Sequence, residues 1–249
     1  GSLIMHGINP AYTLPKSFDF VSALKKVKLT VSTSLHMDET ASLVDYVCPQ
    51  RHNLESWGDA NVFHNKGALI QPTIQPLFNS RQFQDSLLVW SSISDDYYSL
   101  LKNYWSKKTS WNKALHDGVF EFKQTDNEIT KFKAKIVSIK TDSSGIELKL
   151  YQSTALGDGS QANNPWLQEL PDPVTRACWD NYLTISLETA RNLGLSNWNV
   201  SNGALNGDVV NLTVGKNTIK NVPVLIQPGQ ANNSVGLAYG YGREKSGKA

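Results

Sequence analysis

The sequence predicts an α/β domain followed by a mostly β domain. In the first half, short apolar segments alternate with segments of helical spacing, the order that builds a parallel sheet with crossover helices. In the second half, short segments of alternating apolar and polar residues are separated by turn residues, around one short helical segment. The length of 249 residues is sufficient for two domains of ordinary size.

The first half opens with a predicted buried strand at 3–5 and a loop at 7–12. A helix is predicted at 18–26, because apolar residues recur there at helical spacing and Ser17 is suited to cap the first turn. The apolar residues of 27–32 predict a second strand. A strand, a helix and a strand in this order are expected to pair in parallel through a right-handed crossover.

The next helix and strand extend the same pattern. Residues 38–40 are expected to open a short helix, because their two acidic side chains suit the positive end of a helix dipole. A third strand is predicted at 44–48 and is stopped by Pro49. Ligands of such sheets bind beyond the carboxyl ends of the strands. Those ends carry residues 9–10, 32–36 and 49–53.

A long loop is predicted at 50–79, and a loop of that length is usually functional or clamped onto another part of the protein. Glu55 and Asp59 within it could form an acid pair, but an Asx turn at Asp59 beside a solvated Glu55 is favoured. The segment 85–111 is predicted to be helical and is rich in aromatic residues. We interpret these aromatic residues as core packing or as contact with other parts of the protein.

Strands dominate the second half. Residues 131–140 alternate apolar and lysine side chains, and 146–151 continue the pattern after a turn at 142–145. The further predicted elements are a strand at 182–185, a helix at 186–194 capped by Ser186 and ended by Gly194, and strands at 209–214, 222–226 and 234–237. Short strands around one small helix suggest a closed barrel, because closure removes exposed sheet edges.

A proline-rich connector at 163–173 has neither helix nor strand periodicity. Its three prolines fix the backbone and favour extended geometry in the residues before them. Trp166 is costly to expose to water, so we expect the connector to lie pressed on the protein. Ordered coil of this kind usually lines a cleft or crosses a domain junction.

Composition and charge exclude several classes of function. The net charge is +2 and the 24 Lys and Arg residues are scattered, so no nucleic-acid-binding surface is expected. No apolar run reaches the roughly 18 residues of a membrane span. Because the chain starts almost directly with a predicted strand, we expect it to be a fragment of a longer protein.

The cysteines and histidines predict no metal centre. An iron–sulfur cluster is held by about four thiolates, so Cys48 and Cys178 cannot hold one alone. We expect two buried reduced thiols, with a disulfide as the alternative. His36, His52 and His64 lie near the predicted strand ends, but no acidic or thiol residue falls at ligand spacing with any pair of them.

Seven short motifs occur in a characteristic order. They lie at 7–12, 39–40, 46–49, 54–59, 185–194, 206–210 and 223–229. The first four resemble the third domain of the molybdopterin oxidoreductase, or dimethyl sulfoxide reductase, superfamily, and the last three resemble its fourth domain. The resemblance implies a Rossmann-like α/β domain at 1–118 and a double-psi β-barrel, molybdopterin-dinucleotide-binding-like domain at 119–249. The superfamily's first two domains, which carry the cluster cysteines and the metal ligand, are absent from this sequence.

A narrower resemblance is carried by four segments. These are 163–173, 179–182, 227–230 and 240–243. They are similar to the large iron–sulfur subunit of alternative complex III, a membrane-bound quinol:cytochrome c oxidoreductase. The molybdopterin-like half of that subunit is understood to have lost its cofactor and to serve as a scaffold. Trp179 and Asp180 are poor substitutes for the hydrogen-bond donors that hold a pterin in ordinary superfamily members.

Three hypotheses about function follow. In the first, the chain is part of a cofactor-free scaffold in a quinol-oxidising electron-transfer complex. In the second, it is the part of an active molybdenum oxidoreductase that binds the nucleotide tails of a bis-molybdopterin guanine dinucleotide cofactor. In the third, it is a non-redox binding module. We expect no cofactor and no metal in this fragment, no activity of the fragment alone, and iron–sulfur clusters outside this chain.

The resemblance also implies partners and a location. The partners are the missing N-terminal domains of the same protein and other subunits of a membrane electron-transfer complex, without nucleic acid. The location is the periplasmic side of a bacterial inner membrane.

Under the second hypothesis, the residues that contact the nucleotides can be named. In the first domain, the polar residues at the predicted strand ends are Asn9, Ser32, Ser34, His36 and Asp38. In the second domain, the resemblance places Asn181, Gln227 and Gln230 near the mouth of the barrel.

The tryptophans exceed what two modest cores need. We expect each half to fold, because each has its own apolar pattern. We also expect an exposed aromatic patch larger than the few hundred Å² of a typical monomer, where missing domains or partner subunits dock. The patch is expected on the face of 85–111 or along the connector, and the residues concerned are Trp90, Trp105, Trp111, Trp166 and Trp179.

Overall fold

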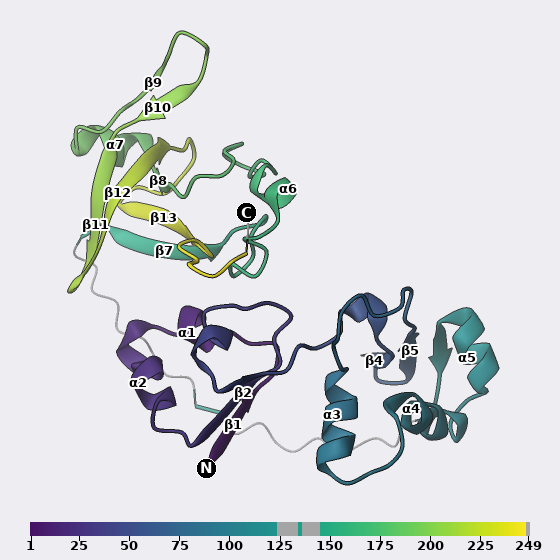
Figure 1. Ribbon diagram of the computed structural model, residues 1–249. Coiled ribbons are helices and arrows are strands. Elements are labelled where there is room, and N and C mark those ends of the chain that lie inside the picture. The colour runs from purple at the N-terminus through teal and green to yellow at the C-terminus, as the bar shows by residue number, and fades with distance from the viewer. Residues whose placement is uncertain (124–133, 136–144, 248–249) are drawn as a thin grey trace. The chain divides into compact units, whose positions relative to one another are not determined.

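The computed structural model describes residues 1–123, 134–135 and 145–247. The chain divides into two compact units, Gly1–Ile136 and Val137–Ala249 (Figure 1). The sequence suggested a domain boundary after residue 118, but the first unit extends further along the chain. Strand β6 (Val119–Glu121) belongs to the first unit because it pairs with strand β5 (Lys66–Ile70).

The first unit begins with a three-stranded parallel sheet. Its strands are β1 (Ser2–Met5), β2 (Leu29–Ser32) and β3 (Tyr46–Val47), in the order β1-β2-β3. Val31 is the central position of the register, since it pairs with Ile4 on one side and with Tyr46 on the other. The parallel strands that the sequence predicted are therefore confirmed.

The helices that connect these strands are shorter than predicted. They are α1 (Pro10–Thr13), η1 (Lys16–Phe18), α2 (Phe20–Leu24) and η2 (Ala41–Leu43), of which η1 and η2 are 3-10 helices. The expected loop at 7–12 is wrong in its second part, because Pro10 opens α1 at the position where proline suits a helix. Ser17 lies inside η1 and caps nothing; Asp19, at φ 45°, separates η1 from α2.

The long loop predicted at 50–79 is wrong. It contains the 3-10 helix η3 (Asn53–Glu55) and the hairpin of β4 (Gly58–Phe63) with β5, and β6 completes a three-stranded antiparallel sheet. The hairpin was missed because its turn residues, His64 and Asn65, are not the Asn-Gly or Gly-rich pairs that mark such turns.

Glu55 is structural and buried, so the expectation of a solvated Glu55 is also wrong. Its carboxylate accepts hydrogen bonds from the backbone N–H of Leu77 and of His52, each at 3.0 Å. These two bonds lower the pKa of Glu55 below its ordinary value. Asp59 lies in β4 rather than in an Asx turn, and it accepts a bond from Trp105 Nε1 at 2.8 Å.

Three helices occupy the segment expected to be one helical stretch. They are α3 (Phe83–Trp90), α4 (Tyr97–Ser106) and α5 (Trp111–Asp117). Trp105 and Trp111 are 2% and 7% exposed and pack in one core with Phe120 of β6 and with Phe122, which directly follows that strand. Core packing is thus confirmed for these two tryptophans, whereas Trp90 is 48% exposed.

The second unit is built on a five-stranded mixed sheet in the order β11-β12-β8-β13-β7. The bounds are β7 (Glu147–Gln152), β8 (Leu183–Ile185), β11 (Val209–Val214), β12 (Asn217–Ile226) and β13 (Ser234–Tyr239). A separate hairpin is formed by β9 (Asn197–Asn199) and β10 (Leu205–Gly207). The strand predicted at 131–140 lies almost wholly outside the described residues. The closed barrel stays a prediction, since β11 and β7 end the sheet in the described part of the chain.

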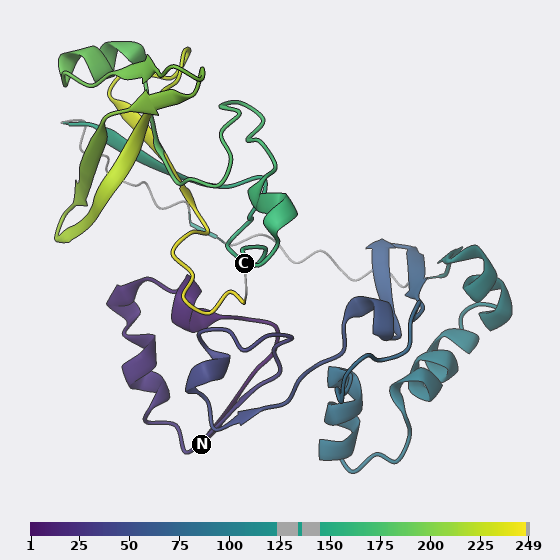
Figure 2. The same cartoon turned by 45° about the horizontal axis from the view of Figure 1, so that its top comes forward.

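One face of this sheet is apolar. Leu183 and Ile185 of β8 pack with Val224 and Leu237 from the neighbouring strands, and the core also includes Ala190 of α7 (Leu187–Asn192). The helix is capped as predicted, because the Ser186 side chain accepts from Thr189 N–H and Gly194 follows the helix at φ 69°. Both views show α7 and α6 (Pro165–Gln168) at different sides of this unit (Figure 1 and Figure 2).

Two expectations about burial are wrong. The connector contains the one-turn helix α6, on which Leu167 is half-buried while the adjacent Trp166 is 83% exposed. Trp166 is therefore not buried against the unit, although exposure of its side chain to water is unfavourable. Cys48 is likewise exposed rather than buried, and neither Cys48 nor Cys178 forms a disulfide.

Candidate functional site

The strand ends of the first unit carry a hydrogen-bonded network centred on Asn9. Asn9 Oδ1 accepts from both the backbone N–H and the hydroxyl of Thr40, at 3.1 and 2.7 Å. Asn9 Nδ2 donates to Glu39 Oε2 at 2.7 Å. Since Thr40 is fully buried, this one amide satisfies the polar groups of a buried residue.

Asp38 extends the network on the other side of Thr40. Its Oδ1 accepts from the backbone N–H of Ala41 at 2.7 Å, and its Oδ2 accepts from Ser34 Oγ at 2.9 Å. His36 is exposed, and its backbone N–H donates to Ser34 Oγ at 3.3 Å. The structure thus brings Asn9, Ser34 and Asp38 around the same short segment.

Ser32 is separate from this network. It is 1% exposed, and its Oγ has no hydrogen-bond partner among the described residues. It lies in β2, directly before the strand's carboxyl end, and is the predicted site residue whose hydroxyl is left unused.

The network has a chemical consequence for anion binding. Free backbone N–H groups at the start of a helix are what ordinarily hold a phosphate at a strand end. Here the N–H groups of Thr40 and Ala41, which begin η2, are occupied by the side chains of Asn9 and Asp38. The two nearby carboxylates, Asp38 and Glu39, would also repel a pyrophosphate. These two N–H groups are therefore not free to hold an anion in this structure.

A cavity of about 310 Å³ lies against the sheet of the second unit. Lys149, Gly236 and Thr184 occupy one row across β7, β13 and β8. A side chain at Gly236 would bring its Cβ within 2.5 Å of Thr184 Oγ1, so glycine leaves the floor of the cavity open. The opposite face of the same strands is the apolar core, because strand side chains alternate.

Two of the predicted residues, Gln227 and Gln230, line this cavity. Gln230 Nε2 donates to the backbone carbonyls of Thr184 and Ser234, at 3.0 and 2.9 Å, and so ties β8 to β13. Asn181 lies in an adjoining cavity of about 20 Å³, where its Oδ1 is buried without a partner in the described part of the chain.

Asp172 lines both cavities and organises the segment that covers them. Its Oδ1 accepts from the backbone N–H groups of Val174 and Thr175, at 2.9 and 2.8 Å. Arg176 and Trp179 follow in left-handed backbone conformations at φ 64°, which side chains other than glycine rarely adopt. The connector therefore lines a cleft, as the sequence predicted, although Trp166 itself does not.

Three tyrosines surround the smaller cavity. Burial raises the pKa of Tyr151 to about 12, and the neighbouring Tyr182, Asp172 and Tyr241 add to the shift. Burial also raises the pKa values of Tyr182 and Tyr241, and the Tyr182 hydroxyl is hydrogen-bonded to Thr175 Oγ1. The phenols therefore stay protonated at neutral pH and serve as hydrogen-bonding groups.

The Tyr151 shift predicts a pH dependence. A phenol whose folded pKa lies above its unfolded value of 10.0 stabilises the fold below pH 10, and this contribution is lost as the pH rises towards 12. Tyrosine ionisation is followed by absorbance during an alkaline titration. The Tyr151→Phe variant should lose the absorbance change of one phenol at the high-pH end of the curve. Loss of an early phenol in Tyr151→Phe would contradict the assignment.

Sequence reasoning missed Lys149, Tyr151, Thr184 and Gly236. One signal was available, namely the polar Thr184 between two apolar residues of a short buried strand. A polar residue at that position faces away from the apolar core. The row of Lys149, Gly236 and Thr184 could not be predicted from the sequence, because it depends on the pairing of β7 with β13.

Among the residues that the structure describes, neither a metal centre nor a membrane span is found. In residues 1–123, 134–135 and 145–247, no group of three or more His, Cys, Asp and Glu side chains lies close enough to hold a metal ion. Within the same residues, no helix is long and apolar enough to cross a membrane. His52 has a structural role, since its Nδ1 accepts from Leu54 N–H at 3.2 Å.

No family model matches the chain, and known proteins match it distantly both in sequence and in structure. In sequence, 91 residues are 31% identical to the menaquinone reductase, molybdopterin-binding-like subunit of Nitratidesulfovibrio vulgaris, covering 35% of this chain and 13% of that protein. In structure, acetylene hydratase from Pelobacter acetylenicus matches with a TM-score of 0.65 at 15% identity, over 96% of this chain and 37% of that one. The chain therefore spans a minor part of each protein it matches.

These matches support the broader resemblance inferred from the motifs. The chain is distantly similar to molybdopterin oxidoreductase-like subunits, and its fold is similar to part of acetylene hydratase.

Proposed function

We propose that this chain is part of a molybdopterin oxidoreductase-like subunit that serves as a cofactor-free scaffold in a quinol-oxidising electron-transfer complex of the alternative complex III type. The relative in Nitratidesulfovibrio vulgaris supports a quinone-linked complex, because it is a subunit of a menaquinone reductase; the direction of electron flow belongs to the proposal. The network at Asn9, Asp38 and Thr40 supports the absence of a cofactor.

The network is the observation that carries the proposal. A nucleotide tail could enter this strand end only if the side chains of Asn9 and Asp38 released the N–H groups of Thr40 and Ala41. Each bond to a buried or charged group contributes about 1–3 kcal/mol, so the chain's own side chains compete strongly with a phosphate. The N–H groups that would bind an anion instead form hydrogen bonds that hold the segment 34–41 in place.

Exposed aromatic and apolar side chains support partners at the connector. Trp166 is 83% exposed, Trp179 is 51% exposed and Val174 is 70% exposed. Large exposed apolar patches mark interaction sites. We propose that other domains of the same protein or other subunits of the complex cover this surface, on the periplasmic side of a bacterial inner membrane.

An active molybdenum oxidoreductase is the second candidate. It is favoured by the cavity in the second unit, whose lining includes the polar side chains of Gln227, Gln230 and Lys149. In that case these residues would contact a nucleotide tail even though the first unit does not. The third candidate, a non-redox binding module, would use the same cavity for an unrelated small molecule.

Titration with guanine nucleotides distinguishes the second candidate from the other two. We expect no saturable binding of GMP or GDP to the chain by calorimetry up to millimolar concentration. Saturable binding that Gln227→Ala weakens, and that Gln71→Ala leaves unchanged, would support the second candidate instead. Gln71 is the matched control, because it lies in the first unit and donates to Leu115 O at 2.9 Å.

A further inference from the structure

The tip of the β4–β5 hairpin exposes two adjacent apolar side chains. Phe63 pairs with Lys66 at the end of the hairpin, so His64 and Asn65 form the turn. Val62 is 52% exposed and Phe63 is 67% exposed. The register shifts between Asn61 and Phe63, and such an irregularity re-aims the side chains next to it. Both apolar groups are therefore presented to solvent at one end of the sheet.

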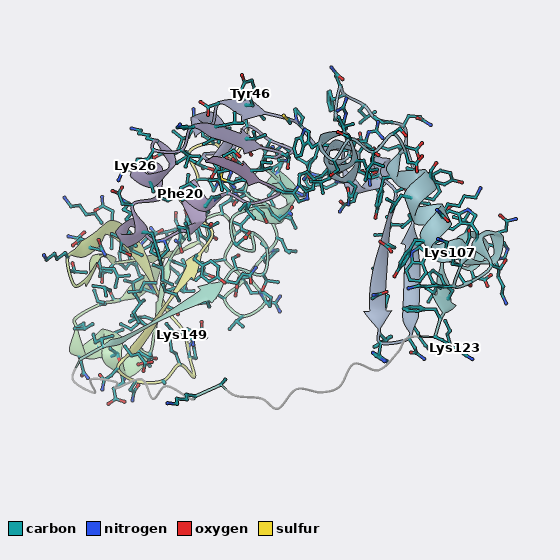
Figure 3. The ribbon with its side chains drawn as sticks, turned by 90° about the horizontal axis from the view of Figure 1, so that it is seen from below. Phe20, Lys26, Tyr46, Lys107, Lys123 and Lys149 are labelled. Atoms are coloured by element: carbon teal, nitrogen blue, oxygen red, sulfur yellow. The ribbon has the colours of Figure 1, made fainter. Side chains whose placement is uncertain are left out.

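Lysines surround this tip. The backbone N–H of Phe122 donates to Asn65 O at 3.0 Å, so the segment after β6 runs beside the turn and brings Lys123 next to it. Figure 3 shows Lys123 at the end of the hairpin, with Lys107 nearby. An open hollow of about 610 Å³ lies here, lined by Asn65, Lys107, Lys108, Glu121, Phe122 and Lys123.

The charge of this region is concentrated well above that of the chain. Lys66 at the turn and Lys107, Lys108 and Lys123 in the lining of the hollow give four positive charges, against the one negative charge of Glu121 in the same lining. Glu121 is already paired with Lys66 at 3.5 Å. The Lys108 ammonium lies 4.1 Å from the centre of the Tyr104 ring, so an aromatic surface holds it beside the hollow.

We propose that the hairpin tip and the lysines around it bind the surface of an anionic lipid bilayer. The lysines would contact lipid phosphates at the hollow, while Val62 and Phe63 enter the boundary between headgroups and acyl chains. A bilayer matches both features at once, because its headgroup phosphates attract the lysines and its acyl boundary accepts an apolar pair at a projecting tip. This proposal goes beyond the scaffold role and does not depend on the absence of a cofactor.

The chain contains a matched control for the apolar pair. Leu77 and Phe78 are also adjacent and are even more exposed, at 70% and 80%. The segment 71–80 around them contains no charged residue. If exposed apolar groups alone caused binding, this second pair would act as well as the first.

Co-sedimentation with lipid vesicles tests the proposal. The chain should bind vesicles that contain phosphatidylglycerol, bind pure phosphatidylcholine vesicles far more weakly, and lose binding as salt is raised. Lys107→Gln and Lys123→Gln should each lower the partition coefficient about fivefold. Phe63→Ser should lower it roughly tenfold, since a largely exposed phenyl ring loses its apolar contact. Phe78→Ser and Lys26→Gln should leave it unchanged.

Three results would overturn the proposal. The first is equal or absent binding to both kinds of vesicle. The second is a loss in Phe78→Ser as large as that in Phe63→Ser. The third is a dependence on the lysines without any dependence on Phe63, which indicates an electrostatic surface for an acidic protein. The substituted side chains are exposed, and an unchanged circular dichroism spectrum confirms that each variant is folded.

Discussion

Replacing Trp105 by alanine is expected to lower the free energy of unfolding of the first unit by about 4 kcal/mol. The side chain is 2% exposed, and its ring centre lies 4.7 Å from that of Phe120 and 5.1 Å from that of Phe122. Its Nε1 also donates to Asp59 Oδ2 at 2.8 Å, so the substitution leaves a carboxylate without this partner. A cavity and a lost hydrogen bond then act together.

Urea denaturation followed by circular dichroism measures this effect. Trp90→Ala is the matched control, because Trp90 is a tryptophan of the same unit that is 48% exposed. The control should cost about 1 kcal/mol or less. Similar losses in the two variants would show that the core assigned around Trp105 is wrong.

Asn9→Ala is expected to destabilise the strand-end segment by about 2–3 kcal/mol, because it leaves the buried polar groups of Thr40 without their acceptor. The bond to Glu39 is lost at the same time. Hydrogen exchange of the Thr40 amide reports the effect directly, and its protection should fall by a factor of about 30 or more.

Asn112→Ala supplies the control for this experiment. Asn112 is an exposed asparagine in α5, and its replacement should change stability by about 0.5 kcal/mol or less. Unchanged protection of Thr40 in Asn9→Ala would mean that Asn9 is not the group that occupies its N–H. The strand end would then be open to an anion, and the cofactor-free scaffold would lose its main structural support.

The elements predicted well from sequence were those with a strong local pattern. The three parallel strands of the first unit have apolar runs at regular spacing, and their order fixes the pairing. The helix α7 has a serine at its start and a glycine after its end, and both residues act as predicted.

The elements missed from sequence were those that depend on distant partners. Glu55 is buried because Leu77 supplies a hydrogen bond from 22 positions along the chain. Trp166 is exposed because its short helix turns Leu167 inward instead. The residue types alone do not determine which of the two side chains faces the protein.

The candidate site shows the same division. The strand-end residues Asn9, Ser34 and Asp38 do lie around one short segment, because the carboxyl ends of parallel strands meet at one edge, whereas their contacts with a nucleotide stay a prediction. That they bond to one another and to Thr40, rather than standing ready for a ligand, depends on side-chain directions that sequence spacing does not determine.

Cofactor analysis of the full-length natural protein tests the central claim most directly. Molybdenum and tungsten are measured by elemental analysis, and released pterin by its fluorescence after oxidation, in protein purified from its native source. We predict contents of metal and pterin far below one per protein. A content of one metal with two pterins per protein would contradict the cofactor-free scaffold and establish the active oxidoreductase in its place.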